Sequence, residues 1–233
     1  MSGKVTRFEH PWPAVVLHYT HLISFFALIV TGLYIHSPVP GFSTMGTMKT
    51  IHTLSMEVFI LTTVIRIYWA FFGRGSAYVG SVVKVRDYKQ FAMGRYDWRT
   101  IGEWVKYYLF IRKTRPYTPK YNPLQKLTYG YVFPLGVVWM ALTGFALYVP
   151  TEHAFMWFTD LMGGPNSVRL WHFWGMWIFL AVFLIHLYLV FAEDIVQFPS
   201  MFLRYIPRKH RVVGDYPASD VPGSAASAGT EAK

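Results

Sequence analysis

Four long apolar segments constrain the fold of this chain more than any other feature of its sequence. Each has about twenty residues or more, the length that an α-helix needs to cross about 30 Å of hydrocarbon. Because 53% of all residues are hydrophobic and only 15% are charged, a soluble domain of this size would leave much apolar surface in water. The sequence therefore predicts an all-α membrane protein, built as a bundle of four transmembrane helices. The expected helices occupy residues 12–36, 51–73, 129–149 and 169–193.

The lysines and arginines are distributed unevenly among the connections. Two precede the first segment, twelve lie between the second and the third, and five follow the fourth. The two remaining connections, 36–50 and 150–168, contain only Lys49. Because cytoplasmic loops are enriched in Lys and Arg, we expect both termini and the long middle loop to be cytoplasmic. The formal net charge of +10 then reflects membrane topology, and no nucleic-acid partner is expected.

The first apolar segment resembles a secretory signal peptide, because Lys4 and Arg7 precede it. It is longer than the apolar core of a typical signal peptide, and three further spans follow, so we expect it to be retained as a helix. The sequence contains no cysteine. This excludes disulfides, iron–sulfur clusters held by thiolates and the covalent attachment of c-type haem. Any redox centre in this chain must use other ligands.

The chain is expected to consist of a membrane domain, residues 1–211, and a disordered cytoplasmic tail, residues 212–233, which is rich in Gly, Ala, Ser and Pro. Within the cytoplasmic loop 74–128, an amphipathic helix is expected at about 98–111. This helix could lie on the inner membrane surface, with Trp and Tyr among the lipid headgroups, or be partly buried beneath the bundle. Its apolar positions are Ile101, Trp104, Val105, Tyr108 and Leu109.

Ionisable side chains inside the predicted spans fall at two levels of the membrane. Such residues are costly in hydrocarbon and are therefore candidates for function. His172 and His186 are fourteen residues apart, so they lie about 21 Å apart along one helix and on nearly the same face. The same interval separates matched positions in the other three spans. With a cytoplasmic N-terminus, the inner level contains His18, Arg66, Gly130 and His186, and the outer level contains Gly32, His52, Gly144 and His172.

Each level therefore contains two histidines from different spans and a glycine. Neutral imidazole is a common axial ligand of haem iron, which takes one ligand above and one below the haem plane. We predict that His18 and His186 hold an inner haem b. His52 and His172 would hold an outer haem b. The glycines expected to let the flat macrocycles approach the helix backbones are Gly32, Gly130 and Gly144.

Three further ionisable residues lie within the spans. His21 is one turn from His18 and could replace it as a ligand. Arg66, at the inner level, could pair with a haem propionate in a charge-assisted contact, or it could extend to the lipid headgroups. Glu57 could serve a proton path or an interhelical hydrogen bond. A transporter or proton channel that uses these side chains as a relay is the rival interpretation.

Several short motifs in and around the spans occur together and in a recognisable order. They are His18 with Val30-Thr31-Gly32, Arg66 to Phe71, Asn122-Pro123, Thr143 to Tyr148, Trp171-His172 with Gly175-Met176-Trp177, and His186 with Glu193-Asp194-Ile195. In these motifs the chain resembles the b-type cytochrome subunits of membrane-bound nickel–iron hydrogenases, which are related to the cytochrome subunit of the respiratory formate dehydrogenases. The chain departs from that family at Val16-Leu17-His18-Tyr19, where the family usually has an Arg-x-Trp-His-Trp run.

The resemblance implies partners and a place in the cell. A periplasmic iron–sulfur small subunit, attached to a catalytic large subunit, would pass electrons to the outer haem, then to the inner haem, and then to menaquinone or ubiquinone. Asn122 occupies the place of a quinone-site residue in the formate dehydrogenase relatives, although Asn122-Pro123 is also a favoured start for a helix. The chain would be a multi-pass protein of the bacterial cytoplasmic (inner) membrane. The residues that would ligate the two haems are His18, His52, His172 and His186.

The chain would serve as an electron-transfer subunit and carry out little bond chemistry of its own. Its sequence does not identify the electron donor, because that chemistry would reside in other chains. A subunit of a formate dehydrogenase or another molybdoenzyme is therefore an alternative, and so is a stand-alone carrier in the manner of cytochrome b561. An assembly as a dimer of complexes also stays open.

Overall fold

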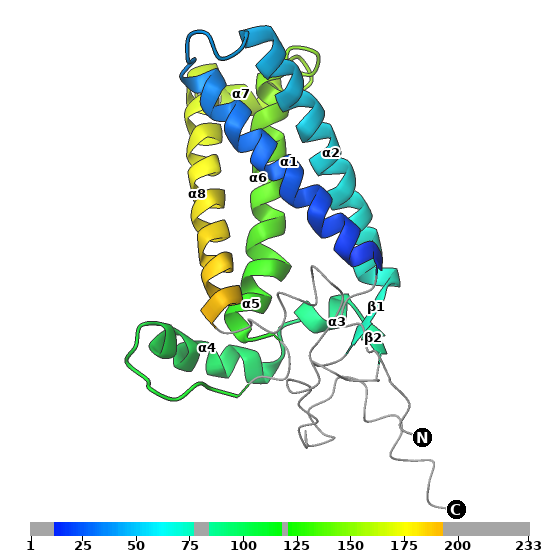
Figure 1. Ribbon diagram of the computed structural model, residues 1–233, viewed down its shortest axis with the longest axis vertical. Coiled ribbons are helices and arrows are strands. Elements are labelled where there is room, and N and C mark those ends of the chain that lie inside the picture. The colour runs from blue at the N-terminus through cyan, green and yellow to red at the C-terminus, as the bar shows by residue number, and fades with distance from the viewer. Residues whose placement is uncertain (1–11, 77–83, 118–120, 193–233) are drawn as a thin grey trace, which may run out of the picture. The chain divides into compact units, whose positions relative to one another are not determined.

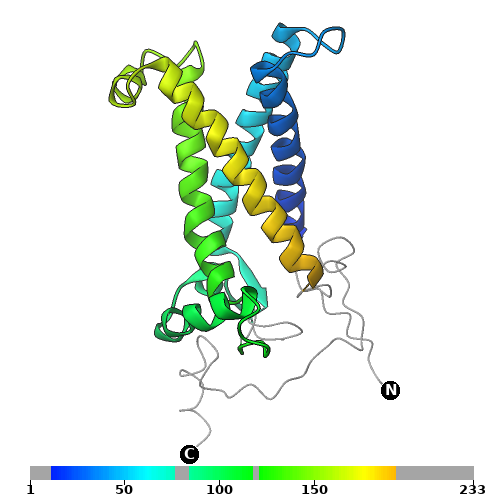
Figure 2. The same ribbon diagram turned by 90° about the vertical axis from the view of Figure 1, so that its left-hand side faces the viewer.

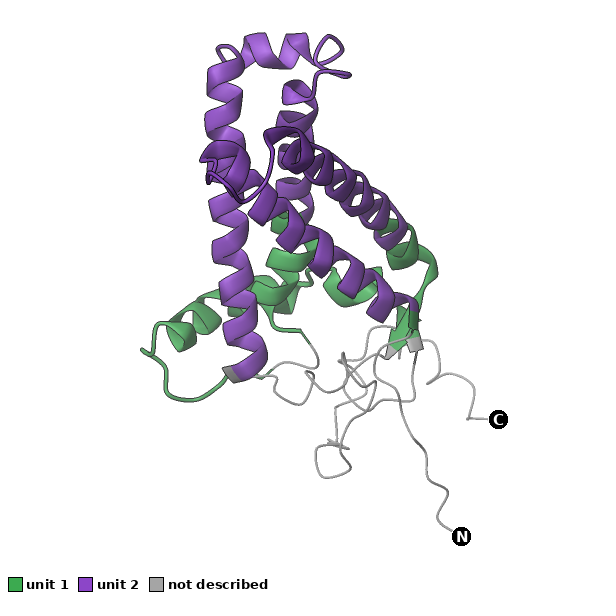
Figure 3. Ribbon diagram, turned by 45° about the horizontal axis from the view of Figure 1, so that its top comes forward, with its two compact units in different colours: residues 1–12, 67–133, 194–233 green, residues 13–66, 134–193 purple. Residues whose placement is uncertain are grey.

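The fold is known from a computed structural model, which describes residues 12–76, 84–117 and 121–192. The tail predicted at 212–233 lies outside the described residues. The chain forms two compact units, which Figure 3 shows in different colours. The first unit consists of residues 13–66 and 134–193 (labelled unit 2 and coloured purple in Figure 3), and the second of residues 1–12, 67–133 and 194–233 (labelled unit 1 and coloured green).

Within the described residues, four helices are long and apolar enough to cross a membrane (Figure 1). This confirms the four spans that the apolar segments predict. Three of the helices are α1 (Trp12–His36), α2 (Met45–Phe72) and α8 (Pro165–Ala192). The remaining span is continuous and consists of α5 (Pro123–Leu127), the π-helical turn η1 (Thr128–Val132) and α6 (Phe133–Leu147).

Three of the spans, α2, the span that begins with α5, and α8, begin earlier than the apolar segments that predict them. Just before α2, Thr44 Oγ1 accepts a hydrogen bond from the backbone N–H of Thr47 at 3.1 Å. Just before α5, Asn122 Oδ1 accepts a hydrogen bond from the N–H of Gln125 at 2.8 Å, and Pro123 fills the first helical position. Polar residues such as Lys49 and Gln125 interrupt these early turns of α2 and α5, so hydropathy does not detect them, whereas the capping residues mark them.

The first unit presents many large apolar side chains outward, while several serine and threonine side chains are buried. Ile23 is 69% exposed, Leu135 70% and Ile178 60%. This is the arrangement expected in lipid, where apolar side chains need no protein cover and small side chains let helices approach closely. The buried serine and threonine residues of its spans are Ser24, Thr31, Thr62 and Thr143.

Two glycines let α6 and α8 approach each other closely; Figure 2 shows these helices, α6 in green and α8 in yellow to orange. A Cβ atom on Gly136 would lie 2.9 Å from the ring of Phe179, and one on Gly175 would overlap the sulfur of Met140. Neither position can accept a side chain without movement of the neighbouring side chain. The connection between these helices contains α7 (Met156–Leu161). It contributes to a small core of Ala146, Phe158 and Val168.

The second unit contains a two-stranded sheet and several short helices. β1 (Arg74–Ser76) pairs antiparallel with β2 (Lys84–Arg86), with Gly75 opposite Val85. The helix α3 (Tyr88–Phe91) follows, and then α4 (Arg95–Tyr108). α4 occupies the region in which the sequence pattern predicts an amphipathic helix.

A buried ion pair joins α4 to α5 in this unit. Lys126 Nζ lies 2.9 Å from Asp97 Oδ2, and the two side chains are 14% and 10% exposed. Asp97 also accepts a hydrogen bond from the N–H of Gly94 at 2.8 Å, which stabilises the first turn of α4. Near the other end of α4, Asn122 Nδ2 donates to the Tyr108 hydroxyl at 2.7 Å. Polar contacts near both ends of α4 therefore tie it to the residues at the start of α5.

Aromatic residues occupy both the covered and the open side of α4. Trp104 is fully buried, whereas Tyr96 and Trp98 are more than half exposed. Arg115 Cζ lies 5.8 Å from the centre of the Trp104 ring, within the range of a cation–π interaction. The hydropathy pattern groups Trp104 with the membrane-facing positions, but the structure covers this residue with protein.

Removal of the buried ammonium should destabilise α4 locally. The substitution Lys126→Met leaves the Asp97 carboxylate buried without its partner, a change that typically costs about 3 to 5 kcal/mol. Hydrogen–deuterium exchange of the purified protein should show faster exchange of the α4 amides. The matched control is Lys106→Met, because the Lys106–Glu103 pair is 57% and 41% exposed and such pairs contribute about 1 kcal/mol or less. Equal exchange in the two variants would contradict the stabilising role of the buried pair.

The expected topology can be mapped with introduced cysteines, because the natural chain has none. We expect Ser37→Cys, in the connection after α1, to react with a membrane-impermeant maleimide in intact cells. Lys113→Cys, in the connection after α4, should react only after the membrane is opened. Both positions are exposed. The reverse labelling pattern would show that the termini are on the other side of the membrane.

Candidate functional site

The outer histidine pair is formed across two helices of the first unit. His52 on α2 and His172 on α8 have ring centres 6.4 Å apart, with ring planes at 69° to each other. A bond between a metal and an imidazole nitrogen is about 2 Å long, so two imidazoles on opposite sides of one metal ion have ring centres about 6 Å apart. The observed separation therefore fits two axial ligands of one iron.

Two threonines hold these histidines from the neighbouring helices. Thr31 Oγ1 lies 2.8 Å from His52 Nδ1, and Thr143 Oγ1 lies 2.8 Å from His172 Nδ1. Thr31 is 3% exposed and Thr143 is fully buried. Because each hydroxyl engages Nδ1, Nε2 is the ring nitrogen left for a metal.

The sequence analysis does not identify Thr31 or Thr143 as functional residues. A signal for both was nevertheless present, because each directly precedes a glycine of the outer level, giving Thr31-Gly32 and Thr143-Gly144. Periodicity could place these threonines near the correct level. It could not show that their hydroxyls reach a histidine on another helix, because that depends on how the helices pack.

Gly32 and Gly144 lie directly against the outer histidines. A Cβ atom on Gly32 would be 3.4 Å from His52 Cε1, and a Cβ atom on Gly144 would be 3.4 Å from His172 Cε1. The absence of a side chain at these positions lets α1 approach α2 and lets α6 approach α8 at the level of the imidazoles. Both glycines that were predicted for the outer level are thus next to the residues that would hold the haem.

Gly130 has a different environment. It lies in η1 (Thr128–Val132), where a Cβ atom would be 3.3 Å from the carbonyl oxygen of Phe91. The π-helical turn adds about one residue to the α-helical repeat, so the fourteen-residue interval to Gly144 no longer keeps the two glycines on one face. The nearest neighbour of Gly130 in its own unit is Phe91, and its role in packing against the inner haem stays a prediction.

The inner pair is formed by α1 and α8. His18 and His186 are both partly buried, and their imidazoles are near enough to interact electrostatically. The ring of His18 also meets the ring of Tyr19 edge-on, with centres 5.7 Å apart. Among the described residues, no hydrogen-bond partner is found for the buried Nδ1 of His18. The two levels therefore differ in how their histidines are held.

Both ring nitrogens of His21 are occupied by protein groups. Nδ1 lies 2.9 Å from the carbonyl oxygen of Leu17, and Nε2 lies 3.0 Å from Thr63 Oγ1. The ring also packs edge-on against Phe59 at 4.9 Å. These contacts connect α1 to α2 and leave neither nitrogen ready for a metal, which favours His18 as the α1 ligand.

Arg66 and Glu57, two charged residues of α2, have different surroundings. Arg66 is partly buried and lies near enough to His21 to interact with it electrostatically, on the part of α2 that carries the inner level. Glu57 is exposed on the surface of its helix. The structure therefore places Arg66 near His21, whereas Glu57 is on the exposed surface of α2, and the pairing of Arg66 with a haem propionate stays a prediction.

Asn122, the quinone candidate, forms the N-terminal cap of α5. Its Oδ1 accepts from the N–H of Gln125, and Gln125 Oε1 accepts in turn from the N–H of Asn122 at 2.9 Å. Together with the contact to Tyr108, these bonds engage both ends of a side chain that is fully buried. The observed role of Asn122 is thus structural, and its place in a quinone site stays a prediction.

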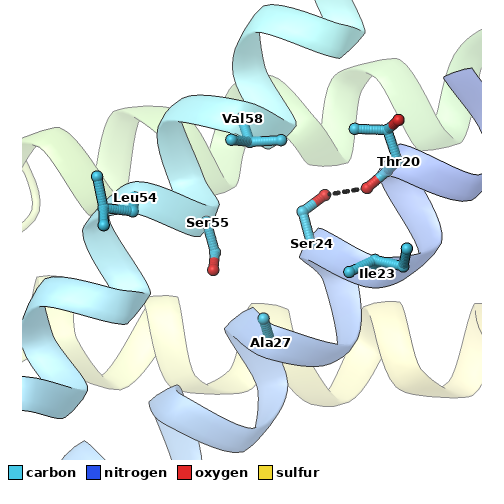
Figure 4. A pocket seen from close by; sticks show the side chains of 7 residues that line it. All are labelled: Thr20, Ile23, Ser24, Ala27, Leu54, Ser55 and Val58. Carbon is cyan, nitrogen blue, oxygen red and sulfur yellow. Dashed lines mark hydrogen bonds between the residues drawn. The ribbon is translucent and has the colours of Figure 1, made fainter.

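A separate cavity of about 270 Å³ lies between α1 and α2 (Figure 4). It lies along the stretch between the two histidine levels, and its wall is mostly apolar. The Ser24 hydroxyl on this wall donates to the backbone carbonyl of Thr20 at 2.7 Å. No histidine or carboxylate lines the cavity, so it is distinct from both histidine pairs. Its lining residues are Thr20, Ile23, Ser24, Ala27, Leu54, Ser55 and Val58.

The chain as a whole is similar to a known protein family. The family model described as prokaryotic cytochrome b561 matches residues 9–204. The chain belongs to this family. A cytochrome of the b type binds haem b, so family membership and the paired histidines indicate the same cofactor.

Individual members of the family are similar over most of their length. A probable Ni/Fe-hydrogenase B-type cytochrome subunit of Azotobacter vinelandii is 30% identical over 203 residues, which cover 81% of this chain and 82% of the relative. The protein of the same description from Rhizobium leguminosarum bv. viciae is 31% identical, with 81% and 82% covered. A probable Ni/Fe-hydrogenase 1 B-type cytochrome subunit of Escherichia coli K12 is 28% identical, with 83% and 86% covered. These similarities confirm the resemblance found in the sequence motifs.

Proposed function

We propose that this chain is the di-haem cytochrome b subunit of a membrane-bound nickel–iron hydrogenase. It anchors the periplasmic iron–sulfur and catalytic subunits and carries their electrons to menaquinone or ubiquinone in the membrane. The family and the descriptions of its relatives support this proposal. The observation that carries it is the facing pair His52 and His172, whose 6.4 Å separation fits two ligands of one iron.

Four histidines would hold two haem b groups. At the outer level, Nε2 of His52 and of His172 would be the ligating atoms, because the threonine hydroxyls engage Nδ1. At the inner level, His18 and His186 would be the ligands, because His21 has both nitrogens occupied. When bound, haem b supplies a one-electron ferric–ferrous couple at each level.

The protein's own contribution is spacing, orientation and the exclusion of water. α8 provides one ligand for each level, and fourteen residues of one continuous helix separate them by about 21 Å. A single helix therefore sets the distance between the two centres. Gly32 and Gly144 keep side chains away from the outer imidazoles, and Arg66 is the candidate partner for a propionate of the inner haem.

The direction of electron flow follows from the expected topology. With cytoplasmic termini, the outer level would face the periplasmic subunits and the inner level would face the cytoplasm. Oxidation of one hydrogen molecule releases two protons and two electrons on the outer side. A quinone that accepts those two electrons near the inner level takes up two protons from the cytoplasm to form quinol. This separation of charge would generate a membrane potential without a proton pump, and Asn122 is the candidate residue for the quinone site.

A subunit of a molybdoenzyme such as formate dehydrogenase and a stand-alone carrier are the alternatives. Purification of the tagged chain from its native membranes in mild detergent should yield iron–sulfur and nickel–iron subunits in stoichiometric amounts. Mass spectrometry of the complex distinguishes the three cases. A molybdenum-containing partner would support the first alternative, and a haem-loaded chain without partner subunits would support the second.

Histidine substitutions should remove the haems in pairs. We expect His52→Ala and His172→Ala to lose the same redox component, and His18→Ala and His186→Ala to lose the other, because each haem needs both axial ligands. The measurements are the haem-to-protein ratio and a redox titration of the difference spectrum. His36→Ala is the matched control, since this exposed imidazole stacks on Phe173 with centres 4.0 Å apart and should leave both haems in place.

The same measurements distinguish His18 from His21 as the ligand that α1 contributes. His21→Ala should retain both haems, because this residue makes structural contacts with Leu17 and Thr63. Loss of the inner haem from His21→Ala, together with its retention in His18→Ala, would reverse the assignment. Wild-type protein without any b-type absorption band would overturn the whole proposal and favour the transporter interpretation.

A further inference from the structure

We propose that Thr31 and Thr143 are positioning residues of the outer haem site, which fix the tautomer of its two histidine ligands and lower its reduction potential. This inference rests on the proposed function, because it assigns a role toward the haem that His52 and His172 would hold. The proposal concerns only the two hydroxyl groups. Each contacts Nδ1 of its histidine, the ring nitrogen that would not bind the iron.

The direction of each hydrogen bond follows from the number of hydrogens available. Thr31 Oγ1 donates to the carbonyl oxygen of Ala27 at 2.6 Å, and Thr143 Oγ1 donates to that of Trp139 at 2.9 Å. A hydroxyl group has one hydrogen but can accept through its lone pairs. Toward the imidazole, each threonine oxygen is therefore the acceptor, and Nδ1 of the histidine must carry the hydrogen.

This assignment settles which nitrogen is free for the iron. A neutral imidazole carries one hydrogen, so a protonated Nδ1 leaves the lone pair on Nε2. The threonines thus select the tautomer that can bind iron through Nε2 before any haem arrives. They also limit the rotation of each ring, and the two ring planes stand at 69°.

The same bonds should make the imidazoles stronger electron donors. An imidazole that donates its other N–H to an acceptor is a more basic metal ligand. Here the acceptor is itself polarised, because each hydroxyl donates to a backbone carbonyl, and hydrogen bonds in a chain strengthen one another in a low dielectric. Thr31 is 3% exposed and Thr143 is fully buried, so bulk water does not weaken these contacts. A more basic ligand stabilises ferric over ferrous iron, which lowers the reduction potential.

The arrangement is repeated by two separate helix pairs. α1 supplies Thr31 to His52 on α2, and α6 supplies Thr143 to His172 on α8. In both cases the next residue is the glycine whose Cα faces the same imidazole. Each Thr-Gly unit therefore provides an acceptor for the ring and the space that the ring needs.

At the inner level, at least one of the two histidines has no such hydrogen bond among the described residues. Within the described part of the chain, the buried Nδ1 of His18 has no hydrogen-bond partner. On this contact alone, the ligand contributed by α1 would be less basic than the two ligands of the outer level, and the outer site would have the lower reduction potential.

The test is a redox titration of the intact complex with Thr31→Val, Thr143→Val and the double variant. Valine keeps the shape of threonine but cannot accept a hydrogen bond. We expect the midpoint potential of the outer haem to rise in each single variant and further in the double variant, while that of the inner haem stays unchanged. The low-spin electron paramagnetic resonance signal of the outer haem should also shift, because it reports the orientation and donor strength of the axial imidazoles.

Two further substitutions separate the hydroxyl group from simple packing. Thr31→Ser and Thr143→Ser keep the acceptor and should restore the wild-type potential and spectrum. Thr62→Val is the matched control. Thr62 is also buried in the first unit. Among the described residues, its hydroxyl bonds only to the carbonyls of Val58 and Phe59, at 2.8 and 3.0 Å. Its replacement should shift neither potential.

The possible failures are distinguishable. If the valine variants retain the outer haem with an unchanged potential and spectrum, the inference is wrong and the proposed function stands. If serine and valine variants lose the outer haem alike, side-chain volume and not the hydroxyl is responsible, and the inference is also wrong. If His52→Ala and His172→Ala retain the outer haem, the proposed function itself fails and the inference fails with it.

Discussion

Hydrocarbon supplies no hydrogen bonds, so every polar group within the membrane must find its partner inside the protein. The helical backbones meet this requirement themselves, and the buried threonine hydroxyls meet it by donating to the carbonyl one turn earlier. What remains on each hydroxyl is an acceptor, and at Thr31 and Thr143 that acceptor faces a histidine of a neighbouring helix. The solvent thus dictates both the helical fold and the few polar contacts that connect its helices.

The spans and the histidine levels could be predicted because both depend on distances along one helix. Apolar length gives the number of spans, and the fourteen-residue interval brings His172 and His186 to one face without knowledge of any neighbour. The first turns of α2 and α5 escaped prediction because polar capping residues, such as Asn122, extend these helices beyond the apolar stretch. The π-helical turn at Gly130 changes the helical repeat, and hydropathy contains no information on that change.

Contacts between elements account for the rest of what the sequence could not show. A threonine in a membrane helix satisfies itself with its own backbone, so the repeated Thr-Gly pair hints at a special position but does not show that Thr31 or Thr143 contacts a histidine. Trp104 and Trp98 are both aromatic residues of α4, yet one is buried and the other exposed, and the sequence pattern alone does not show which of them is covered. Periodicity identifies faces, whereas packing decides which neighbour each face meets.

The distribution of the four histidines has a consequence for how such a subunit is assembled in the cell. An outer haem would link α2 to α8 through its two ligands, and an inner haem would link α1 to α8. α6 contributes no histidine to either site. α6 depends instead on Gly136 against Phe179 and on Gly175 against Met140, contacts that need no cofactor. The pair α6–α8 can therefore form as soon as both helices are inserted, while the links that iron would make from α1 and α2 to α8 require the delivery of haem. Maturation of the subunit would then be limited by cofactor supply as well as by synthesis of the chain.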